Sequence, residues 1–358
     1  MSKILYAAST VSHINSFHKP YIEALRAEGH QVFVMAKGEG ADFDIPFRKK
    51  MLSRENRECR KQIRQIVDRE RFDIIILNTS LAAFHIRLAL GKCRPKVLNI
   101  VHGYLFSKKS RGIKKKAKSL LLLLAEKLLR GRVDCILTMN SEDYLLAKKH
   151  RLAPRVENSK GMGVMPRTVG KTPSEIRAEM SSSAFALLFV GELSGRKNQR
   201  FLIESMPDIR KEIPNAELWL VGDGDAEGEL KDLAASLSLT DSVKFLGRRQ
   251  NPQDYMNAAD LYVSASEIEG LPFNVAEAMS LGCTCLLSRI KGHEDLAAKD
   301  AAYLYTPGSR EEFCRAVADI YEGRLPRLSE AAKDAFLEFS YGSVFEKTYG
   351  AIKDLCDI

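Results

Sequence analysis

Two glutamates in the C-terminal half, Glu269 and Glu277, lie eight positions apart where a strand, a loop and a helix should follow one another. The surrounding segment, residues 264–282, reads SASEIEGLPFNVAEAMSLG, with a glycine and proline loop before the helical periodicity. A helix N-terminus presents N–H groups without intrahelical acceptors and the positive end of the helix dipole, which suits a phosphate. One carboxylate before the helix and one inside it can accept hydrogen bonds from hydroxyl groups on either side. The segment therefore predicts a site for a phosphorylated, hydroxyl-rich ligand.

The simpler alternative is that Glu269 is a solvated loop charge and Glu277 a charge on the helix surface. Against it, Ala276, Ala278 and Met279 flank Glu277 on a helix whose apolar content predicts burial. A buried carboxylate is costly without a partner, so this position favours the binding interpretation.

Short β-branched runs alternate with amphipathic stretches along the whole chain, which predicts an α/β protein of parallel βαβ units. In the N-terminal half we expect strands at 4–8, 31–36, 73–77, 96–101 and 135–139, with helices near 17–28, 55–70, 82–90, 113–130 and 141–150. In the C-terminal half we expect strands at 185–190, 217–221, 243–246, 261–264 and 284–288, with helices near 198–213, 227–237, 252–259, 274–281, 310–322 and 329–339.

The stretch 151–182 interrupts this alternation with glycines and prolines, and we interpret it as the interdomain linker. The fold class is thus α/β, with two doubly wound parallel sheets in tandem. Ligands of such sheets bind beyond the carboxyl ends of the strands, so the expected site is a crevice between the two domains.

The composition of the 358 residues, 45% hydrophobic and 28% charged, excludes collagen-like, low-complexity and largely disordered chains. The net charge of +9 is the sum of two oppositely charged halves. Residues 1–170 carry 34 basic and 15 acidic side chains, and residues 171–358 carry 21 basic and 31 acidic ones. Halves of opposite charge predict two domains with different tasks. The longest apolar block, 120–125, is too short to predict a membrane span, and the apolar run in the first ten residues is too brief to predict a signal peptide. Seven scattered cysteines predict neither a disulfide framework nor a zinc site, and they fit a reducing cytoplasm.

Five motifs of the C-terminal half, in order, resemble those of the family-4 retaining glycosyltransferases, which have the GT-B fold of two facing Rossmann-like domains. The glutamate pair resembles the Glu–seven residues–Glu motif of this family. The others are FVGELSGRKN at 189–198, LVGDGDAEGEL at 220–230, VKFLGRR at 243–249 and MNAADLYVSAS at 256–266. Five ordered motifs over roughly a hundred residues are far more specific than a lone glycine pattern.

The resemblance implies a role for each matching residue of the donor site. Glu277 would bind the ribose of a nucleotide sugar, Glu269 would contact hydroxyls of the donor sugar, and Lys197 would neutralise the diphosphate. Backbone groups around Leu271, Phe273 and Asn274 would meet the phosphates, and the glycines Gly191 and Gly247 would line the phosphate loop and the nucleobase turn. Many members have Gly-Arg where this chain has Gly191-Glu192, and we expect Arg196 to supply the missing cation.

The N-terminal half resembles a bacterial branch of the family involved in capsule, exopolysaccharide and lipid-linked glycan assembly. The matching pieces are STVSHINSFHKPY at 9–21, RFDIIILNTSLAAFHIRLA at 71–89, VLNIVHGYLF at 97–106 and VDCILTMNSEDYLLAKK at 133–149. His102 follows a strand, and the matching histidine of the family lies close to the donor sugar and the attacking hydroxyl; a turn histidine is the alternative. His13 and Asn15 follow the first strand in what we expect to be a loop, for which a functional and a purely structural role are equally open. The other histidines, His18 and His293 among them, are isolated in the sequence and receive no role.

A metal site is not predicted, and neither is a cofactor. Asp223 and Asp225 could be mistaken for an Asp-X-Asp metal motif, but the resemblance places them in a turn after a strand. Helix N-termini and lysines can neutralise a diphosphate without a divalent ion.

The stretch 107–130, SKKSRGIKKKAKSLLLLLAEKLLR, clusters cations before a leucine-rich amphipathic pattern. Such a pattern is typical of docking on an anionic membrane surface. A core helix whose leucines at 120–124 face the sheet explains it equally well. Nucleic acid is the least favoured partner, because few aromatic residues are interleaved.

These features and the resemblance together lead us to expect a metal-independent glycosyltransferase (a hexosyltransferase) on the cytoplasmic membrane face, and the resemblance implies a retaining one. Residues 1–165 would bind a polyprenyl-diphosphate-linked or other saccharide acceptor, and the resemblance implies that the helix at 341–358 packs back on them. Residues 166–340 would bind the nucleotide sugar, a UDP-sugar by preference. The alternatives are a GT-B nucleotide-sugar epimerase and a non-catalytic membrane or nucleic-acid adaptor.

Overall fold

The computed structural model describes residues 1–358 except 49, 92–93, 107–112, 167 and 357–358. The chain forms two compact units: unit 1 comprises Met1–Gly163 and Tyr341–Ile358, and unit 2 comprises Val164–Ser340. The two segments that connect the units run side by side, because the Val164 N–H donates to the Phe339 carbonyl oxygen at 2.9 Å. The C-terminal segment thereby re-enters unit 1 next to the point where the chain leaves it.

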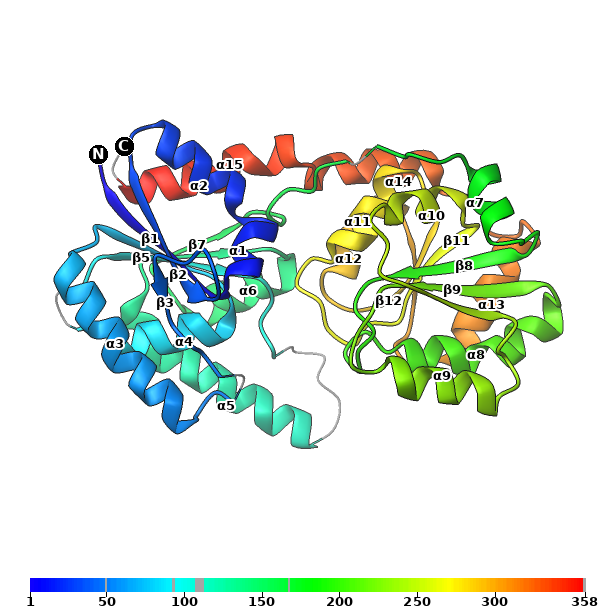
Figure 1. Cartoon of the computed structure of the whole chain (residues 1–358), viewed down its shortest axis with the longest axis horizontal. Helices are drawn as coiled ribbons and strands as arrows, with labels where there is room; N and C mark the ends of the chain where they lie inside the picture. Colours follow the sequence, from blue (N-terminus) through cyan, green and yellow to red (C-terminus); the bar gives the residue numbers. More distant parts are fainter. Residues whose placement is uncertain (49, 92–93, 107–112, 167, 357–358) are drawn as a thin grey trace. The chain divides into compact units, whose positions relative to one another are not determined.

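Unit 1 contains a seven-stranded parallel sheet with the order β3-β2-β1-β4-β5-β6-β7. Its strands are β1 (Lys3–Thr10), β2 (Gln31–Lys37), β3 (Phe43–Asp44), β4 (Ile74–Leu77), β5 (Lys96–Val101), β6 (Cys135–Thr138) and β7 (Arg155–Asn158). Its helices are α1 (Val11–Phe17), α2 (Lys19–Ala27), α3 (Arg54–Glu70), α4 (Ser80–Ala89), α5 (Ile113–Leu129), α6 (Ser141–His150) and α15 (Tyr341–Cys356). Helices α2 and α15 cover one face of the sheet, and α3, α4 and α5 cover the other (Figure 1).

Unit 2 contains a six-stranded parallel sheet with the order β10-β9-β8-β11-β12-β13. Its strands are β8 (Phe185–Val190), β9 (Ala216–Val221), β10 (Val243–Gly247), β11 (Leu261–Ser264), β12 (Cys285–Ser288) and β13 (Tyr303–Tyr305). Its helices are α7 (Pro173–Glu179), α8 (Gln199–Glu212), α9 (Glu227–Ser236), α10 (Pro252–Ala258), α11 (Phe273–Ser280), α12 (His293–Leu296), α13 (Arg310–Tyr321) and α14 (Ser329–Phe336). Helices α8, α9 and α13 lie on one face, and α7, α10, α11 and α14 lie on the other (Figure 1).

Strands buried on both faces account for the near-continuous apolar runs of the sequence. All four residues of β4 are buried, and so are all six of β8. The order of each sheet reverses direction at its centre, between β1 and β4 in unit 1 and between β8 and β11 in unit 2. Loops at the carboxyl ends of such neighbouring strands diverge and leave room for a ligand.

The interpretation of 151–182 as a linker is wrong in two places, where regular secondary structure interrupts it. Arg155–Asn158 forms edge strand β7 of unit 1, Pro173–Glu179 forms α7 of unit 2, and the boundary falls at 163/164. The edge strand has no apolar run because all four of its residues are only half-buried. Among the described residues, no helix is long and apolar enough to cross a bilayer.

Candidate active site

Glu269 lies in the loop after β11, next to the loop that follows β8. A backbone hydrogen bond of 2.9 Å from the Glu267 N–H to the Arg196 carbonyl oxygen joins these two loops. Both loops leave the sheet between β8 and β11, where the strand order reverses. The predicted donor-site residues of the two loops therefore meet at the position where doubly wound sheets bind ligands.

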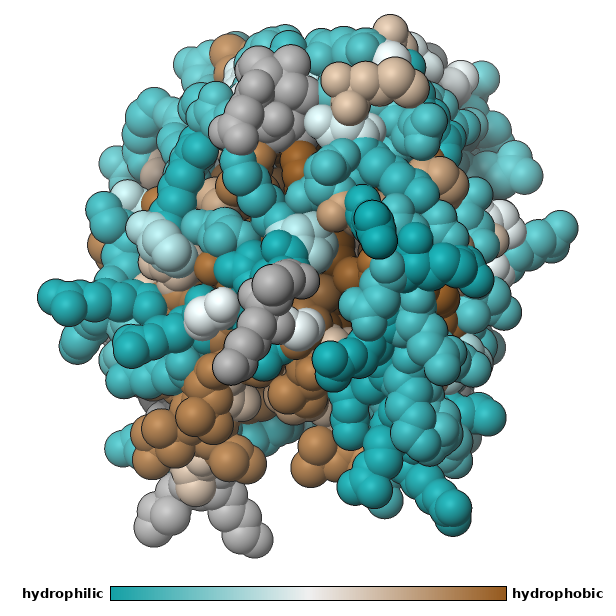
Figure 2. Space-filling view, turned by 90° about the vertical axis from the view of Figure 1, so that its left-hand side faces the viewer, coloured by the Kyte–Doolittle hydropathy of each residue, from teal (hydrophilic) through white to brown (hydrophobic). Residues whose placement is uncertain are grey.

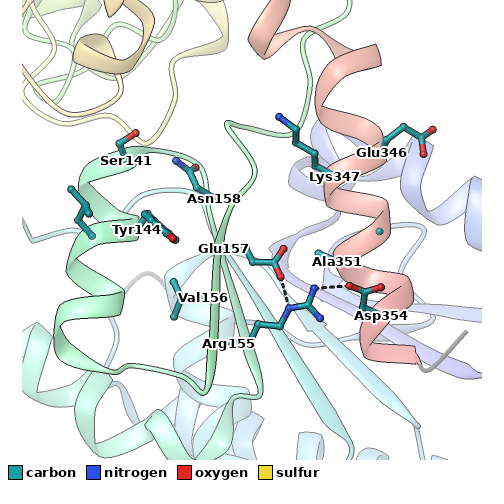
Figure 3. Close-up of a pocket in the computed structure, with 12 residues that line it drawn as sticks. Ser141, Tyr144, Arg155, Val156, Glu157, Asn158, Glu346, Lys347, Ala351 and Asp354 are labelled. Atoms are coloured by element: carbon teal, nitrogen blue, oxygen red, sulfur yellow. Dashed lines mark hydrogen bonds and ion pairs between the residues drawn. The ribbon is translucent and has the colours of Figure 1, made fainter.

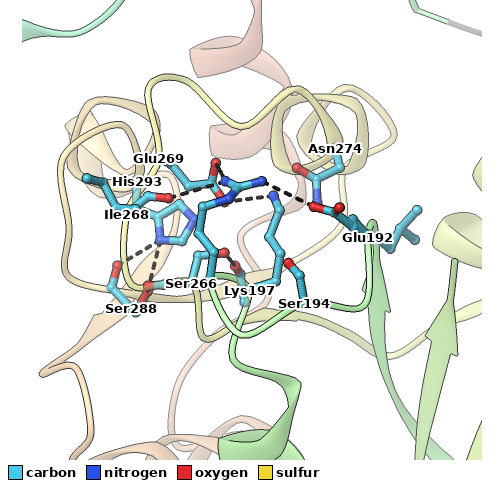
Figure 4. A network of polar contacts seen from close by, with 12 residues as sticks. Glu192, Ser194, Lys197, Ser266, Ile268, Glu269, Asn274, Ser288 and His293 are labelled. Atoms are coloured by element: carbon cyan, nitrogen blue, oxygen red, sulfur yellow. Dashed lines mark hydrogen bonds and ion pairs between the residues drawn. The ribbon is translucent and has the colours of Figure 1, made fainter. Parts of the chain in front are cut away.

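The Glu269 carboxylate is buried between two cations (Figure 4). Its Oε1 lies 2.7 Å from Lys197 Nζ and its Oε2 lies 3.0 Å from an Arg196 guanidinium nitrogen. Burial by itself would raise the pKa of Glu269, but the charges of Lys197 and Arg196 outweigh it and hold the pKa below its usual value. Unit 2 therefore holds an ionised carboxylate and two cations in one cluster.

The side chain of Gln199, which is buried, holds the loop that carries both cations in place. Its amide donates to the Glu192 carbonyl oxygen at 2.8 Å and accepts from the Ser194 N–H at 3.2 Å. The Glu192 side chain remains exposed and lies 3.7 Å from the guanidinium of Arg196. Arg196 thus lies between two carboxylates, at the position where a second cation was expected.

Close backbone contact between neighbouring loops explains the glycines of the motifs. Gly191 and Gly222 both have positive φ, and a Cβ on Gly222 would lie 2.0 Å from the Gly191 carbonyl oxygen. The Gly222 N–H donates to the Gly247 carbonyl oxygen at 2.9 Å, which ties in the turn after β10. The loops after β8, β9 and β10 therefore form one continuous edge.

Helix α11 begins at Phe273, directly after the buried Leu271 and Pro272. The side-chain amide of Asn274 donates to the Tyr262 hydroxyl at 2.9 Å and to the Val190 carbonyl oxygen, so it fixes the start of the helix against β8 and β11. Glu277 lies one turn further along and is half-buried, less enclosed than its apolar neighbours predict.

His293, to which the sequence analysis assigned no role, is fully buried in the same cluster (Figure 4). Its Nδ1 lies 2.8 Å from the Ser288 carbonyl oxygen, and its Nε2 has no hydrogen-bond partner among the described residues. Burial lowers the pKa of His293 to about 4, so the ring is neutral at pH 7. In the sequence, the only sign of a role for His293 is its position after a strand and a glycine, and many structural histidines occupy such positions.

In unit 1, His102 directly follows β5 and His13 lies on α1, and their Nε2 atoms are 3.3 Å apart. His18, which was also assigned no role, lies between α1 and α2 with its Nε2 3.1 Å from that of His102. The expectation that His13 and Asn15 share a loop is wrong, because a Thr10 cap starts a helix there. Asn15 is exposed and lines a separate hollow of about 430 Å³, which none of the three histidines lines.

Burial is the main cause of low histidine pKa values in this cluster. It lowers the pKa of His13 to about 4 and brings those of His18 and His102 well below the usual value. All three rings are therefore neutral at pH 7.

The basic stretch falls partly outside the described residues, since 107–112 are not among them. On α5, Leu122 and Leu123 pack against the core, and Arg87 of α4 forms a bidentate ion pair of 2.8 Å with Glu126. The alternative in which all leucines at 120–124 face the sheet is wrong. Several apolar side chains point outward: Leu120 is 58% exposed, Leu121 68%, Leu124 48% and Leu128 84%. Figure 2 shows apolar side chains gathered over this helix at the lower edge of the unit 1 face.

A second hollow, of about 710 Å³, lies between α6, β7 and α15 in unit 1 (Figure 3). Arg155 crosses it and pairs with Glu157 and, at 2.6 Å, with Asp354 of α15. None of the predicted site residues lines this hollow. Its ion pairs fasten the C-terminal helix to the last strand of the sheet.

Family profiles match both units. A profile described as Glycosyltransferase Family 4 matches residues 21–150, and one described as Glycosyl transferases group 1 matches residues 184–323. The putative glycosyltransferase EpsD of Bacillus subtilis is 28% identical over 375 residues, which cover 99% of this chain and 97% of that protein.

An Escherichia coli protein named UDP-Gal:alpha-D-GlcNAc-diphosphoundecaprenol alpha-1,3-galactosyltransferase is 24% identical over 81% of this chain and 76% of its own length. Among solved structures, Anabaena Alr3699/HepE in complex with UDP and glucose superposes with a TM-score of 0.76 at 20% identity, over 99% of this chain and all of that one. This likeness confirms the predicted GT-B class of fold.

Proposed function

The chain belongs to the glycosyltransferases of family 4, and we propose that it transfers a sugar from a UDP-sugar to a lipid-linked saccharide with retention of the anomeric configuration. The observation that carries the proposal is the cluster of Glu269, Lys197 and Arg196 beside the first turn of α11. Cations and helix N–H groups suit a diphosphate, and a carboxylate suits the hydroxyls of a sugar. Glu277, further along α11, is the proposed partner of the ribose hydroxyls.

In the proposed reaction the bond from the anomeric carbon to the diphosphate oxygen breaks while a bond to the acceptor hydroxyl oxygen forms on the same face. The proton of that hydroxyl passes to the departing phosphate oxygen. Lys197 and Arg196 stabilise the negative charge that grows on the diphosphate, so the donor site needs no divalent ion. Glu269 orients the donor sugar, and His102 of unit 1 is the proposed contact of the transferred sugar.

The relatives support the choice of donor and acceptor. The Anabaena protein was solved with UDP, and the name of the Escherichia coli relative specifies a UDP-sugar and a diphosphoundecaprenol-linked acceptor. We propose a related role in bacterial surface polysaccharide synthesis for this chain.

The exposed leucines of α5 support docking of unit 1 on an anionic membrane, where such an acceptor is anchored. Four exposed cations lie on or beside the same helix: Lys116, Lys118, Lys127 and Arg130. At about 1 kcal/mol each, they supply roughly 4 kcal/mol of attraction, close to a thousandfold in partitioning.

The test of docking is sedimentation with phosphatidylglycerol vesicles. We expect the double variant Leu124→Glu/Leu128→Glu to lose vesicle binding, whereas Leu337→Glu, at a 60% exposed leucine of unit 2, should retain it. Equal binding by all three proteins would refute the docking surface and leave the donor site untouched.

The test of the donor site is thermal unfolding with UDP, GDP, dTDP and CDP, followed by transfer assays with the corresponding sugars. A nucleotide present at one hundred times its Kd adds about 2.7 kcal/mol of stability. We expect this rise with UDP alone, and transfer that survives treatment with a chelator. A chain that no nucleotide stabilises would contradict the proposal.

A further inference from the structure

Three imidazole rings of unit 1 converge through their Nε2 atoms. His102 Nε2 lies 3.3 Å from His13 Nε2 and 3.1 Å from His18 Nε2, and one ring nitrogen from each of the three lies within 4.8 Å of the others. The rings of His13 and His18 stand edge-on to that of His102, with interplanar angles of 73° and 77°.

The fold holds this arrangement in place. Thr10 caps helix α1 and sets the position of His13, while the break between α1 and α2 turns His18 back toward β5. His18 is fully buried, and its ring lies 5.9 Å from that of Tyr6 of β1. Both segments emerge from the carboxyl edge of the sheet, as does His102.

A single ring nitrogen cannot make a full hydrogen bond in both of these contacts. A neutral imidazole nitrogen carries either one N–H or one lone pair, so His102 Nε2 makes one direct hydrogen bond at most. The second short contact must then share that same proton or lone pair, or set two like groups against each other.

A metal ion at the point of convergence would accept all three lone pairs. Zinc–imidazole bonds of 2.0–2.1 Å in tetrahedral geometry place neighbouring ligand nitrogens about 3.3 Å apart. The observed separations from His102, 3.1 and 3.3 Å, match this spacing. Neutral imidazole selects zinc, cobalt, nickel and copper over magnesium and calcium, which prefer oxygen ligands.

We propose that His13, His18 and His102 bind one divalent transition-metal ion of the zinc and cobalt class through their Nε2 atoms. The site lies within unit 1 and is distinct from the cations at Glu269. A bound ion occupies the lone pair of His102. If the proposed function holds, zinc therefore inhibits transfer reversibly, whereas a chelator does not inhibit it.

Cobalt provides the direct test, because tetrahedral Co²⁺ has visible absorption bands that report its ligands independently of any transfer reaction. We expect the full chain, freed of metal by a chelator, to bind one Co²⁺ with these bands and to release it to Zn²⁺. Loss of a direct ligand in His13→Gln or His102→Gln should weaken binding by more than about tenfold. His13 is only half-buried, so His13→Gln should fold even if a His18 variant does not.

The matched control is His30→Asn, which removes a histidine at the opposite, amino edge of the sheet. His30 precedes β2 and accepts from the Ser2 N–H through Nδ1, a contact that an asparagine oxygen can replace. We expect this control to bind Co²⁺ like the wild type.

Two results would overturn the metal site: a folded wild-type chain without the cobalt bands, or bands that persist unchanged in both His13→Gln and His102→Gln. Transfer assays with and without Zn²⁺ separate this inference from the proposed function. A chain that binds cobalt through these histidines but transfers no sugar retains the metal site and contradicts the glycosyltransferase reaction.

Discussion

Replacing Glu269 by glutamine tests the donor-site cluster most directly. The change removes the charge while keeping the size of the side chain. Lys197, whose side chain is only 10% exposed, loses its partner at 2.7 Å. Arg196 loses a contact of 3.0 Å, but its side chain is 44% exposed and can turn to water.

The expected loss of stability follows from these exposures. Removing one partner of a buried ion pair costs about 3–5 kcal/mol, whereas an exposed pair contributes roughly 0–1 kcal/mol. Because the glutamine oxygen still accepts a hydrogen bond from Lys197, we expect the lower end, about 3 kcal/mol. At roughly 2–4 °C per kcal/mol, unit 2 should unfold about 6–12 °C lower than in the wild type.

Nucleotide binding should change in the opposite direction. In the wild type a diphosphate must compete with Glu269 for Lys197 and Arg196, and in Glu269→Gln both cations are available. We therefore expect UDP to raise the unfolding temperature of the variant by more than it raises that of the wild type. Transfer should nevertheless fall by at least about a hundredfold, because the charged partner of the donor sugar is gone.

The assays are thermal unfolding with and without UDP, calorimetric titration of UDP, and transfer from the UDP-sugar. Glu330→Gln is the matched control, since Glu330 is 85% exposed in unit 2 and pairs with the nearby Lys333 at 3.2 Å. An unchanged unfolding temperature combined with weaker UDP binding in Glu269→Gln would show that this carboxylate does not compete for the cations, and the reasoning would be refuted.

Three further perturbations test the architecture around the sites. Arg87→Met should destabilise unit 1 by about 3–5 kcal/mol in urea unfolding, because it leaves the Glu126 carboxylate without its cationic partner. The double variant Arg87→Met/Glu126→Leu should recover most of this loss, and a double variant as unstable as the single one would contradict the prediction. Burial depresses the pKa of His293 to about 4 from 6.5, so the unfolded chain takes the proton first as pH falls. Stability should therefore drop by about 3 kcal/mol between pH 6.5 and 4, and by correspondingly less in His293→Asn; identical pH profiles from urea unfolding would contradict this. Gly222→Ala places a Cβ 2.0 Å from the Gly191 carbonyl oxygen, so UDP should no longer stabilise the variant against heat, and an unaltered UDP response would rule out the close contact.

The sequence by itself determined the alternation of strands and helices, because strands buried on both faces must be apolar throughout. It also located Glu269 and Lys197 in loops directly after strands, through motifs whose order is specific to one family. It could not locate β7, because a half-buried edge strand such as RVEN has no apolar run.

Only the tertiary structure decided which of these residues meet. Glu269 and Lys197 are 72 positions apart, and they pair because β8 and β11 are neighbours in the sheet order. Helical periodicity alone did not tell which leucines of α5 face outward, since the direction is set by the contact of Glu126 with the buried Arg87. The three converging histidines come from α1, the α1–α2 junction and the end of β5, and their separation along the chain concealed them until the sheet brought the three segments together.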